Sequence, residues 1–438
     1  MVSFIKRGVM VRAMLLCSLL LAASVSRTQT NTENFARFEF NFNNPGARAA
    51  GLGGAFISIA DDATAAEANP AGLTNLVRPE LSFETKGIQF KKTVPNFSHQ
   101  GTAKNYVLVD HDFKNSVVSP SFASVVFPVA RFTFSAFRYE MVNFQSTYYT
   151  KGSYIPPDTT GRHLFPVDSD IKMKIVNWGG AVAFKISKAL SVGASFGLSH
   201  MSVQSSLNRY YLEVFRPGNL ANTATIDDAA NDLFFNAGIT IQPLENLSFG
   251  VIFKRRPSFS LKHSFTYTDY PNDSTAHKNV NFNIPMSFGA GVSYRPTDVL
   301  TVSFDAVRVT YSRLTKDFVL TISEEYTKPS DYTSDDGFEF HAGAEYVLLL
   351  KSFGVVFRGG FWSEPDNQIR WVGKVDDSTD PVRTRSRQTQ AALFQKGETT
   401  YHYTLGIGFL ISNNVQFDVA GNTSTGRNEV VGSFVVRF

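Results

Sequence analysis

The sequence predicts an all-β protein, a transmembrane antiparallel β-barrel of about fourteen strands with an N-terminal plug (hatch) that contains short helices. Three observations lead to this fold class. The chain begins with a secretory signal pattern, it repeats strand-like segments along most of its length, and it ends on an amphipathic strand whose last residue is aromatic. Together these features are typical of bacterial outer-membrane proteins.

The N-terminus carries Lys6, Arg7 and Arg12, followed by a short apolar run over 13–25 and then small and polar residues. This order predicts a signal peptide over 1–28. The run is too short to cross a bilayer as a helix, which needs about 20 apolar residues. Because Cys17 lies within the run, we expect the mature chain to contain no thiol and no disulfide.

The composition agrees with a barrel wall. The 438 residues are 43% apolar and include 40 Phe and 16 Tyr, yet the mean hydropathy is only −0.10. A barrel needs apolar residues on one face of each strand only. Four basic residues and no acidic ones lie in residues 1–30, which leaves 38 Lys and Arg against 38 Asp and Glu. A neutral mature protein gives no reason to expect a nucleic-acid partner.

About fourteen segments have the period of two that indicates a strand with one apolar face. Counting back from the C-terminus, their connections are alternately short and long, as expected for periplasmic turns and external loops. The expected strands are 80–90, 121–129, 132–146, 171–186, 190–206, 233–242, 247–265, 284–295, 301–314, 338–349, 353–362, 401–411, 415–421 and 429–438.

Residues 31–78 do not fit the strand pattern. The segment 46–76 is rich in Ala and Gly, Asp61 or Asp62 is a plausible helix N-cap, and Pro70 with Gly72 would end a short helix. Such an irregular backbone cannot face lipid, so it belongs inside the lumen. We therefore expect a signal peptide (1–28), a hatch (29–78) and an outer-membrane barrel (79–438).

The last ten residues alternate, with Phe434, Val436 and Phe438 on one face. A final strand of this kind resembles the assembly signal of outer-membrane barrels, in which the last strand pairs with the first and removes both sheet edges. The expected partners are therefore outer-membrane lipid and the barrel-assembly machinery. A barrel that buries its own edges is expected to be a monomer.

Within the hatch, the residues Gly53–Gly54–Ala55–Phe56, the stretch ADDATA at 60–65 and Asn69–Pro70–Ala71–Gly72–Leu73 resemble the N-terminal region of the FadL/TodX family of outer-membrane transporters. The order of signal peptide, hatch, fourteen strands and terminal aromatic is similar too. The resemblance implies passive uptake of hydrophobic compounds, either long-chain fatty acids or aromatic hydrocarbons. It also implies hatch movement and lateral release through a gap in the wall.

By the same resemblance, Asn69, Pro70 and Ala71 would lie at that lateral opening, beside a kink in the third strand. The apolar phase of 132–146 changes after Phe134, as a bulge near Ser135 and Ala136 would require. A strand register assigned wrongly from the sequence would explain the change equally well.

Candidate ligand-binding residues come from strand parity. If Phe249 and Phe253 face lipid, Lys254, Arg256 and Lys262 face the lumen, and Arg358 joins them from another strand. Lys254, Arg256 and Arg358 could hold a carboxylate ligand, since a charged hydrogen bond is stronger in a partly dry cavity. The alternative, which we favour, is that these charges pair across the lumen or contact water.

The sequence offers nothing for catalysis, for a metal or for a cofactor. The pattern Gly193–Ala194–Ser195–Phe196–Gly197 matches G-x-S-x-G, but it lies within a strand and not at a strand-to-helix turn. Two other functions stay open. One is a general porin, which a plug disfavours, and the other is a FadL-like accessory or shuttle barrel of type IX protein secretion. The sequence does not identify the substrate.

Overall fold

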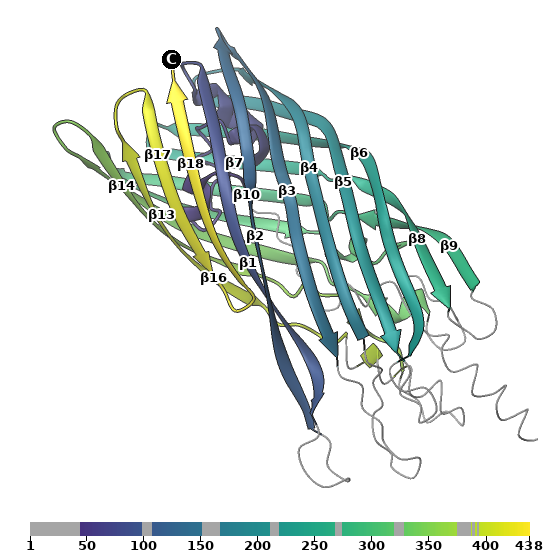
Figure 1. The fold of residues 1–438 in the computed structure, drawn as a ribbon. Helices are drawn as coiled ribbons and strands as arrows, with labels where there is room; N and C mark the ends of the chain where they lie inside the picture. The colour runs from purple at the N-terminus through teal and green to yellow at the C-terminus, as the bar shows by residue number, and fades with distance from the viewer. Residues whose placement is uncertain are drawn as a thin grey trace, which may run out of the picture.

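The structure is a computed structural model that describes residues 44–98, 107–150, 167–210, 219–267, 274–318, 328–374, 387, 390–391 and 394–438. The predicted signal peptide and residues 29–43 of the predicted hatch lie outside this part. The described chain forms a closed antiparallel barrel of 14 strands, which confirms the predicted fold class (Figure 1). In chain order the wall strands are β1 (Glu80–Ser98), β2 (Val107–Val129), β3 (Phe132–Thr150), β4 (Val167–Lys185), β5 (Leu190–Tyr210), β6 (Leu220–Leu244), β7 (Leu247–Arg255), β10 (Ser287–Thr297), β11 (Leu300–Val309), β13 (Gly337–Leu349), β14 (Gly354–Glu364), β16 (Thr400–Leu410), β17 (Val415–Thr423) and β18 (Arg427–Arg437).

The barrel closes between its first and last strands. β1 pairs with β18 from Glu80 opposite Arg437 to Phe90 opposite Arg427. The backbone N–H of Phe438 then donates to Pro79 O (3.0 Å). Phe434 and Phe438 are exposed on the outer face, as the alternation predicts. This pairing leaves neither strand as a free sheet edge.

The end of the barrel that carries the C-terminus has the short connections, at 130–131, 186–189, 245–246, 298–299, 350–353 and 411–414. Short turns mark the periplasmic end of outer-membrane barrels. Next to this end, the wall exposes a belt of apolar side chains, as a lipid-facing surface requires. The belt includes Phe134, Trp178, Phe196, Leu233, Phe249, Phe288, Phe304, Phe357, Phe417 and Phe434.

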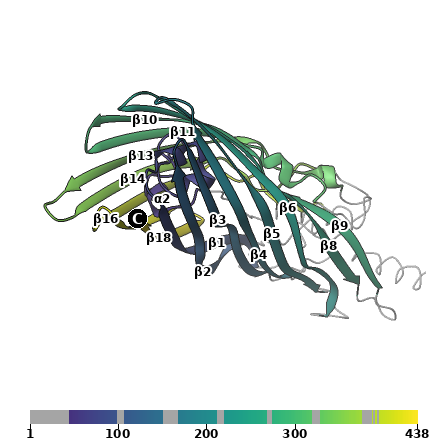
Figure 2. The same ribbon diagram turned by 90° about the horizontal axis from the view of Figure 1, so that it is seen from above.

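The described part of the hatch lies inside the barrel, toward the periplasmic end (Figures 1 and 2). It contains α2 (Ala47–Gly51), α3 (Ala65–Ala68) and the 3-10 helix η3 (Pro70–Asn75). Asn69 precedes η3, and its side chain accepts from Ala71 N, while Pro70 occupies the first turn, where its missing N–H costs nothing. No helix in the described ranges is long and apolar enough to cross a membrane.

The strand expected at 247–265 is interrupted. β7 ends at Arg255, and after Arg256 and Pro257 the chain resumes as β8 (Ser258–Tyr267), which pairs with β9 (Ser274–Asn283). Proline has no N–H to donate to a ladder, so a break at this position is expected physically. The positions that face inward change from even-numbered to odd-numbered across the break. Lys262, which was expected to face the lumen, is therefore exposed. The remaining elements are η4 (Tyr311–Leu314), η5 (Pro329–Asp331) and the pair β12 (Tyr332–Thr333) and β15 (Arg370–Trp371).

The predicted bulge near Ser135 and Ala136 is wrong in position. Both residues pair regularly with β2 and with β4, and the register of β3 shifts between Glu140 and Val142. Phe134 is exposed to lipid, whereas Phe137 is buried and faces inward. The change of apolar phase in the sequence therefore records a change in which face of the strand is apolar, not an extra residue.

Candidate functional site

The polarity of the wall reverses along its strands. In the half of the barrel beyond the apolar belt, which we call the extracellular half, the outward side chains of β4, β5 and β6 are polar and exposed, including Asp168, Lys172, Gln204, Asp227 and Asn231. Many of their inward neighbours are apolar and at most 1% exposed. We call this lining the apolar lumen, and its members on these strands are Ile171, Met173, Ile175, Met201, Val203 and Ile226.

The apolar lumen continues onto the neighbouring strands and ends on the hatch. Buried apolar residues from β3, β8, β9 and η4 join hatch residues in one contiguous cluster. Its members include Tyr139, Phe144, Phe259, Leu261, Phe282, Tyr311, Leu52, Phe56 and Leu73. Apolar side chains are therefore in continuous contact from the extracellular half to the hatch.

Wall glycines make room for the hatch. A Cβ at Gly193 would lie 2.4 Å from Pro70 C, and one at Gly250 would lie 2.4 Å from Ile57 O. Similar clashes would follow at Gly238, Gly343 and Gly360, against Asn69, Leu52 and Gly53. These glycines were not identified from the sequence, although inward-facing glycines within strands are the available signal.

The first polar anchor joins Glu67 of α3 to the wall. Its carboxylate is 2.8 Å from Arg256 Nη1 and 3.4 Å from Lys254 Nζ, and it accepts from Asn236 Nδ2 (3.0 Å). All three charged residues are at most 3% exposed. Burial alone raises the pKa of Glu67, but Lys254 and Arg256 more than offset it, so the pKa lies below its ordinary value.

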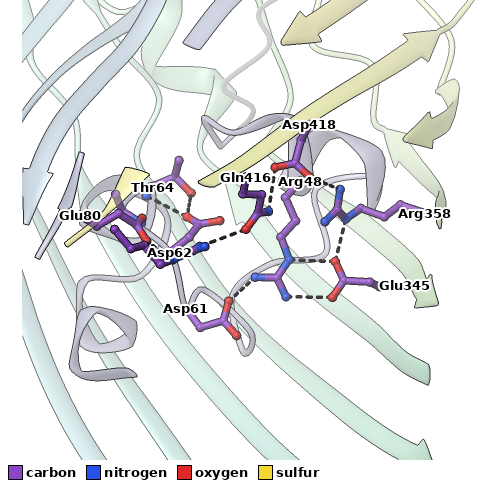
Figure 3. Close-up of polar contacts among 11 residues, drawn as sticks. Arg48, Asp61, Asp62, Thr64, Glu80, Glu345, Arg358, Gln416 and Asp418 are labelled. Atoms are coloured by element: carbon purple, nitrogen blue, oxygen red, sulfur yellow. Dashed lines mark hydrogen bonds and ion pairs between the residues drawn. The ribbon is translucent and has the colours of Figure 1, made fainter. Parts of the chain in front are cut away.

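The second anchor joins Arg48 of α2 to the wall (Figure 3). Arg48 donates to both oxygens of Glu345, at 2.9 and 3.0 Å, and also contacts Asp61. Arg358 donates to Glu345 (2.7 Å) and to Asp418 (2.6 Å), both in the wall. The two guanidinium groups therefore share one carboxylate, and the hatch is part of a buried charge network.

Wall carboxylates also bind hatch backbone. Asp305 accepts from Phe56 N (2.6 Å) and Ile57 N (2.8 Å), and Glu80 accepts from Ala63 N (2.8 Å). A buried backbone N–H without a partner costs about 1–3 kcal/mol. The hatch has little regular structure of its own, so these side chains supply the acceptors that helices and strands supply elsewhere.

Asn69, Pro70 and Ala71 lie against the inner faces of β5 and β6. Asn69 is fully buried, and its Nδ2 donates to Ile57 O (2.8 Å) within the hatch and to Ile239 O (3.3 Å) in β6. Pro70 lies over Gly193 of β5. This segment therefore connects two parts of the hatch with the wall.

The wall between β2 and β3 is interrupted in the extracellular half. Their backbone ladder ends where Phe122 pairs with Tyr139, and among the described residues the strands do not pair farther out. Side chains cross this gap, which we call the β2–β3 seam. Arg138 donates to Pro120 O (2.6 Å), Asn143 donates to Ser119 Oγ (3.1 Å), and the rings of Phe113 and Tyr149 lie 5.2 Å apart.

The residues suggested by sequence for ligand binding all face inward and all meet acidic groups. Lys254 and Arg256 bind Glu67, and Arg358 binds Glu345 and Asp418. The cations are therefore paired, as in the alternative favoured from the sequence, but their partners lie in the hatch and on nearby strands and not across the lumen. Among the described residues, no group of three or more His, Cys, Asp or Glu side chains is placed to hold a metal.

Comparison with known proteins gives a consistent result. Solved structures with the same fold include the monoaromatic hydrocarbon channel CymD (16% identity, TM-score 0.59) and the Ralstonia pickettii toluene transporter TbuX (16%, 0.57). They also include a Pseudomonas aeruginosa FadL homologue (15%, 0.58). Each alignment covers 91% of this chain and 99% of the other. No curated protein sequence matches this chain significantly.

A family model described as outer membrane protein transport protein (OMPP1/FadL/TodX) matches residues 23–361. The match covers most of the chain, and the barrel with its internal hatch is the fold of the similar structures. The family consists of outer-membrane transporters of hydrophobic compounds, and its members are not enzymes. The chain therefore belongs to the OMPP1/FadL/TodX family and is located in the bacterial outer membrane.

Proposed function

We propose that the protein admits hydrophobic small molecules, either long-chain fatty acids or aromatic hydrocarbons, without an energy source. The observation that carries this proposal is the apolar lumen that ends on the hatch. Transfer of apolar surface from water to such a lining is favourable by about 25 cal/mol per Å². A porin for polar solutes has a polar lumen instead. The similar structures described as toluene and monoaromatic hydrocarbon channels support the same ligand class.

Transport requires the hatch to move, and we propose that Asn69, Pro70 and Ala71 belong to the part that shifts. The contacts of this segment with the wall are hydrogen bonds and packing, which can exchange for others. We place lateral release at the β2–β3 seam, where the ladder ends at Tyr139, and not at Ser135 and Ala136, which lie within a continuous ladder.

The test compares cells that carry the protein in their outer membrane with cells that lack it. We expect saturable accumulation of radiolabelled toluene or oleate, and no increase in sucrose permeation. The ratio of the two labelled compounds identifies the substrate class. Absence of ligand uptake, together with co-purification of a secreted protein, would instead support the type IX secretion accessory.

A further inference from the structure

A second interruption of the wall lies between β6 and its neighbours β7 and β8. β6 pairs with β5 along most of its length, from Leu220 to Ile241. On its other edge it pairs with β7 over Phe235–Leu244 and with β8 over Asn222–Ile226. Residues 227–234 of β6 face 256–262 without a backbone ladder in this described part of the chain. We call these two stretches the β6–β8 seam.

Side chains of β6 replace the missing backbone acceptors. Asp232 Oδ2 accepts from Ser258 N (2.7 Å), and Asp228 Oδ2 accepts from Lys262 N (2.8 Å). From the other side, Arg255 Nη1 donates to Leu233 O (3.0 Å). Single side-chain hydrogen bonds do not hold two strands at ladder distance as successive backbone pairs do.

The β8–β9 hairpin beyond the seam is separated from β7 and β10 by two short breaks. β7 and β8 are separated by Arg256 and Pro257, and β9 and β10 by 284–286, which includes Pro285. Ile284 N donates to Pro257 O (3.0 Å), so the two breaks lie side by side. The hairpin of β8 and β9 is therefore joined to the wall through two proline-containing links and, farther out, through the ladder of β8 with Asn222–Ile226 of β6.

The seam lies between two apolar regions, one outside the barrel and one inside it. On the outside it begins at Leu233, a 60% exposed member of the lipid-facing belt, and continues past polar residues such as Asn231. On the inside lie Phe234, Phe259 and Leu261, which are at most 1% exposed and belong to the apolar lumen. The seam thus lies at the outer boundary of the bilayer, directly over the apolar lumen.

The seam is also connected to the hatch. Arg256, the first residue of the break, points inward and binds Glu67 of α3 at 2.8 Å. A change in the position of Glu67 acts directly on the chain segment that leads into β8. The hatch and the seam therefore share one ion pair.

From these contacts we propose that the β6–β8 seam is a second lateral passage, through which apolar molecules at the outer boundary of the membrane enter the apolar lumen. The passage widens when residues 256–262 move away from 227–234 of β6 and the two aspartate hydrogen bonds exchange with water, while the ladder of β8 with Asn222–Ile226 stays paired. This inference rests on the proposed transport function and adds an entry route to it. The β2–β3 seam then serves for release, on the other edge of the slab formed by β3, β4, β5 and β6.

The test uses cysteine pairs joined by a short bis-thiol cross-linker. Ala229→Cys with Ser260→Cys bridges the seam, because both side chains are exposed on the outer face near its middle. The matched control is Ala229→Cys with Ser202→Cys, since these residues are paired in the continuous ladder of β5 and β6. Heat-modifiable migration in gels verifies that each variant is folded, and the readout is accumulation of radiolabelled toluene by cells.

We expect cross-linking of the seam pair to lower the uptake rate at least fivefold and cross-linking of the control pair to leave it unchanged. Equal rates in the two cross-linked proteins would overturn the passage. Spin labels at the same pairs give a readout that does not depend on transport. Toluene should broaden the Ala229–Ser260 distance distribution and not the Ser202–Ala229 one, and an unchanged seam distance argues against opening. If the protein without cross-linker shows no uptake, the proposed function fails separately.

Discussion

The lipid-facing half of the barrel and the extracellular half have opposite radial polarity. Around the hatch, the outer face of the wall is apolar. Its inner face carries the charged residues that bind Glu67 and Arg48 of the hatch. Beyond the belt, the outer face is largely polar and the inner face is largely apolar. One half is arranged for a membrane around it, and the other is arranged like a water-soluble protein around a core. The comparison shows that a single strand can satisfy both environments when its apolar face changes sides at the membrane boundary.

The largest effect is expected from a substitution in the polar interior of the lipid-facing half. Glu67→Ala leaves Lys254 and Arg256 buried without their carboxylate, and removal of one partner of a buried ion pair costs about 3–5 kcal/mol. We expect the hatch to detach, measured as faster protease cleavage at Arg48 in detergent. Asp61→Ala is the control, because the Asp61 side chain is 43% exposed and its ion pair is worth at most about 1 kcal/mol. Equal cleavage of the two variants contradicts the anchoring role.

The next effect concerns the fit of hatch to wall. Gly193→Val places side-chain atoms where Pro70 lies, and overpacking of this kind costs about 1–3 kcal/mol. We expect a lower thermal transition of the hatch and a similar increase in protease cleavage. At Gly432 a Cβ would have no heavy atom within 4 Å, so Gly432→Val serves as the matched control. A stable hatch in Gly193→Val would show that the close approach is not needed.

The apolar lumen is tested by charge placement on the two faces of β4. Met173→Asp puts a carboxylate among buried apolar side chains, and we expect ligand uptake to fall about tenfold or more, equivalent to about 1.4 kcal/mol. Lys172→Asp changes the neighbouring exposed residue, where uptake should remain within about twofold. Uptake that is equally reduced by both changes would place the ligand path outside the apolar lumen.

The smallest expected effect is a dependence on pH. The pKa of Glu67 is lower in the docked hatch than in the free chain, where a glutamate titrates at about 4.3. Its stabilising contribution is therefore complete above that value and is lost as the pH falls through the lower folded value. Protease cleavage of the hatch should rise as the pH falls below the free-chain value, with one step that is missing in Glu67→Gln. Identical pH curves would contradict this assignment.

The barrel could be predicted from the sequence because the period of two survives over most of the wall, whichever face is apolar. The same analysis misplaced the irregularity of β3, since Phe134 and Phe137 are apolar for two different reasons, lipid on one side and lumen on the other. The inward position of Lys254 and Arg256 followed from parity, whereas their partner Glu67 did not. Glu67 belongs to the hatch, whose contacts depend on tertiary placement and have no sequence period.

The divided strand at Arg256 and Pro257 shows a different limit. The proline was visible in the sequence, but the parity of the flanking residues could be assigned only from one side of the break. As a result Lys262 was expected to face the lumen and instead lies on the surface. The aspartates of the β6–β8 seam gave no signal either, because a side chain that replaces a backbone acceptor looks like any exposed acid.

Glu80 combines three parts of the chain in a way that bears on biogenesis. It lies in the first strand, its Oε2 accepts from Arg437 Nε of the last strand (2.8 Å), and its Oε1 accepts from Ala63 N of the hatch (2.8 Å). The two ends of the wall can meet only after every intervening strand has been made, which is the slowest kind of contact to form. Because one carboxylate at that junction binds both the last strand and the hatch, barrel closure is stabilised by the docked hatch. A barrel without its hatch would therefore close less stably.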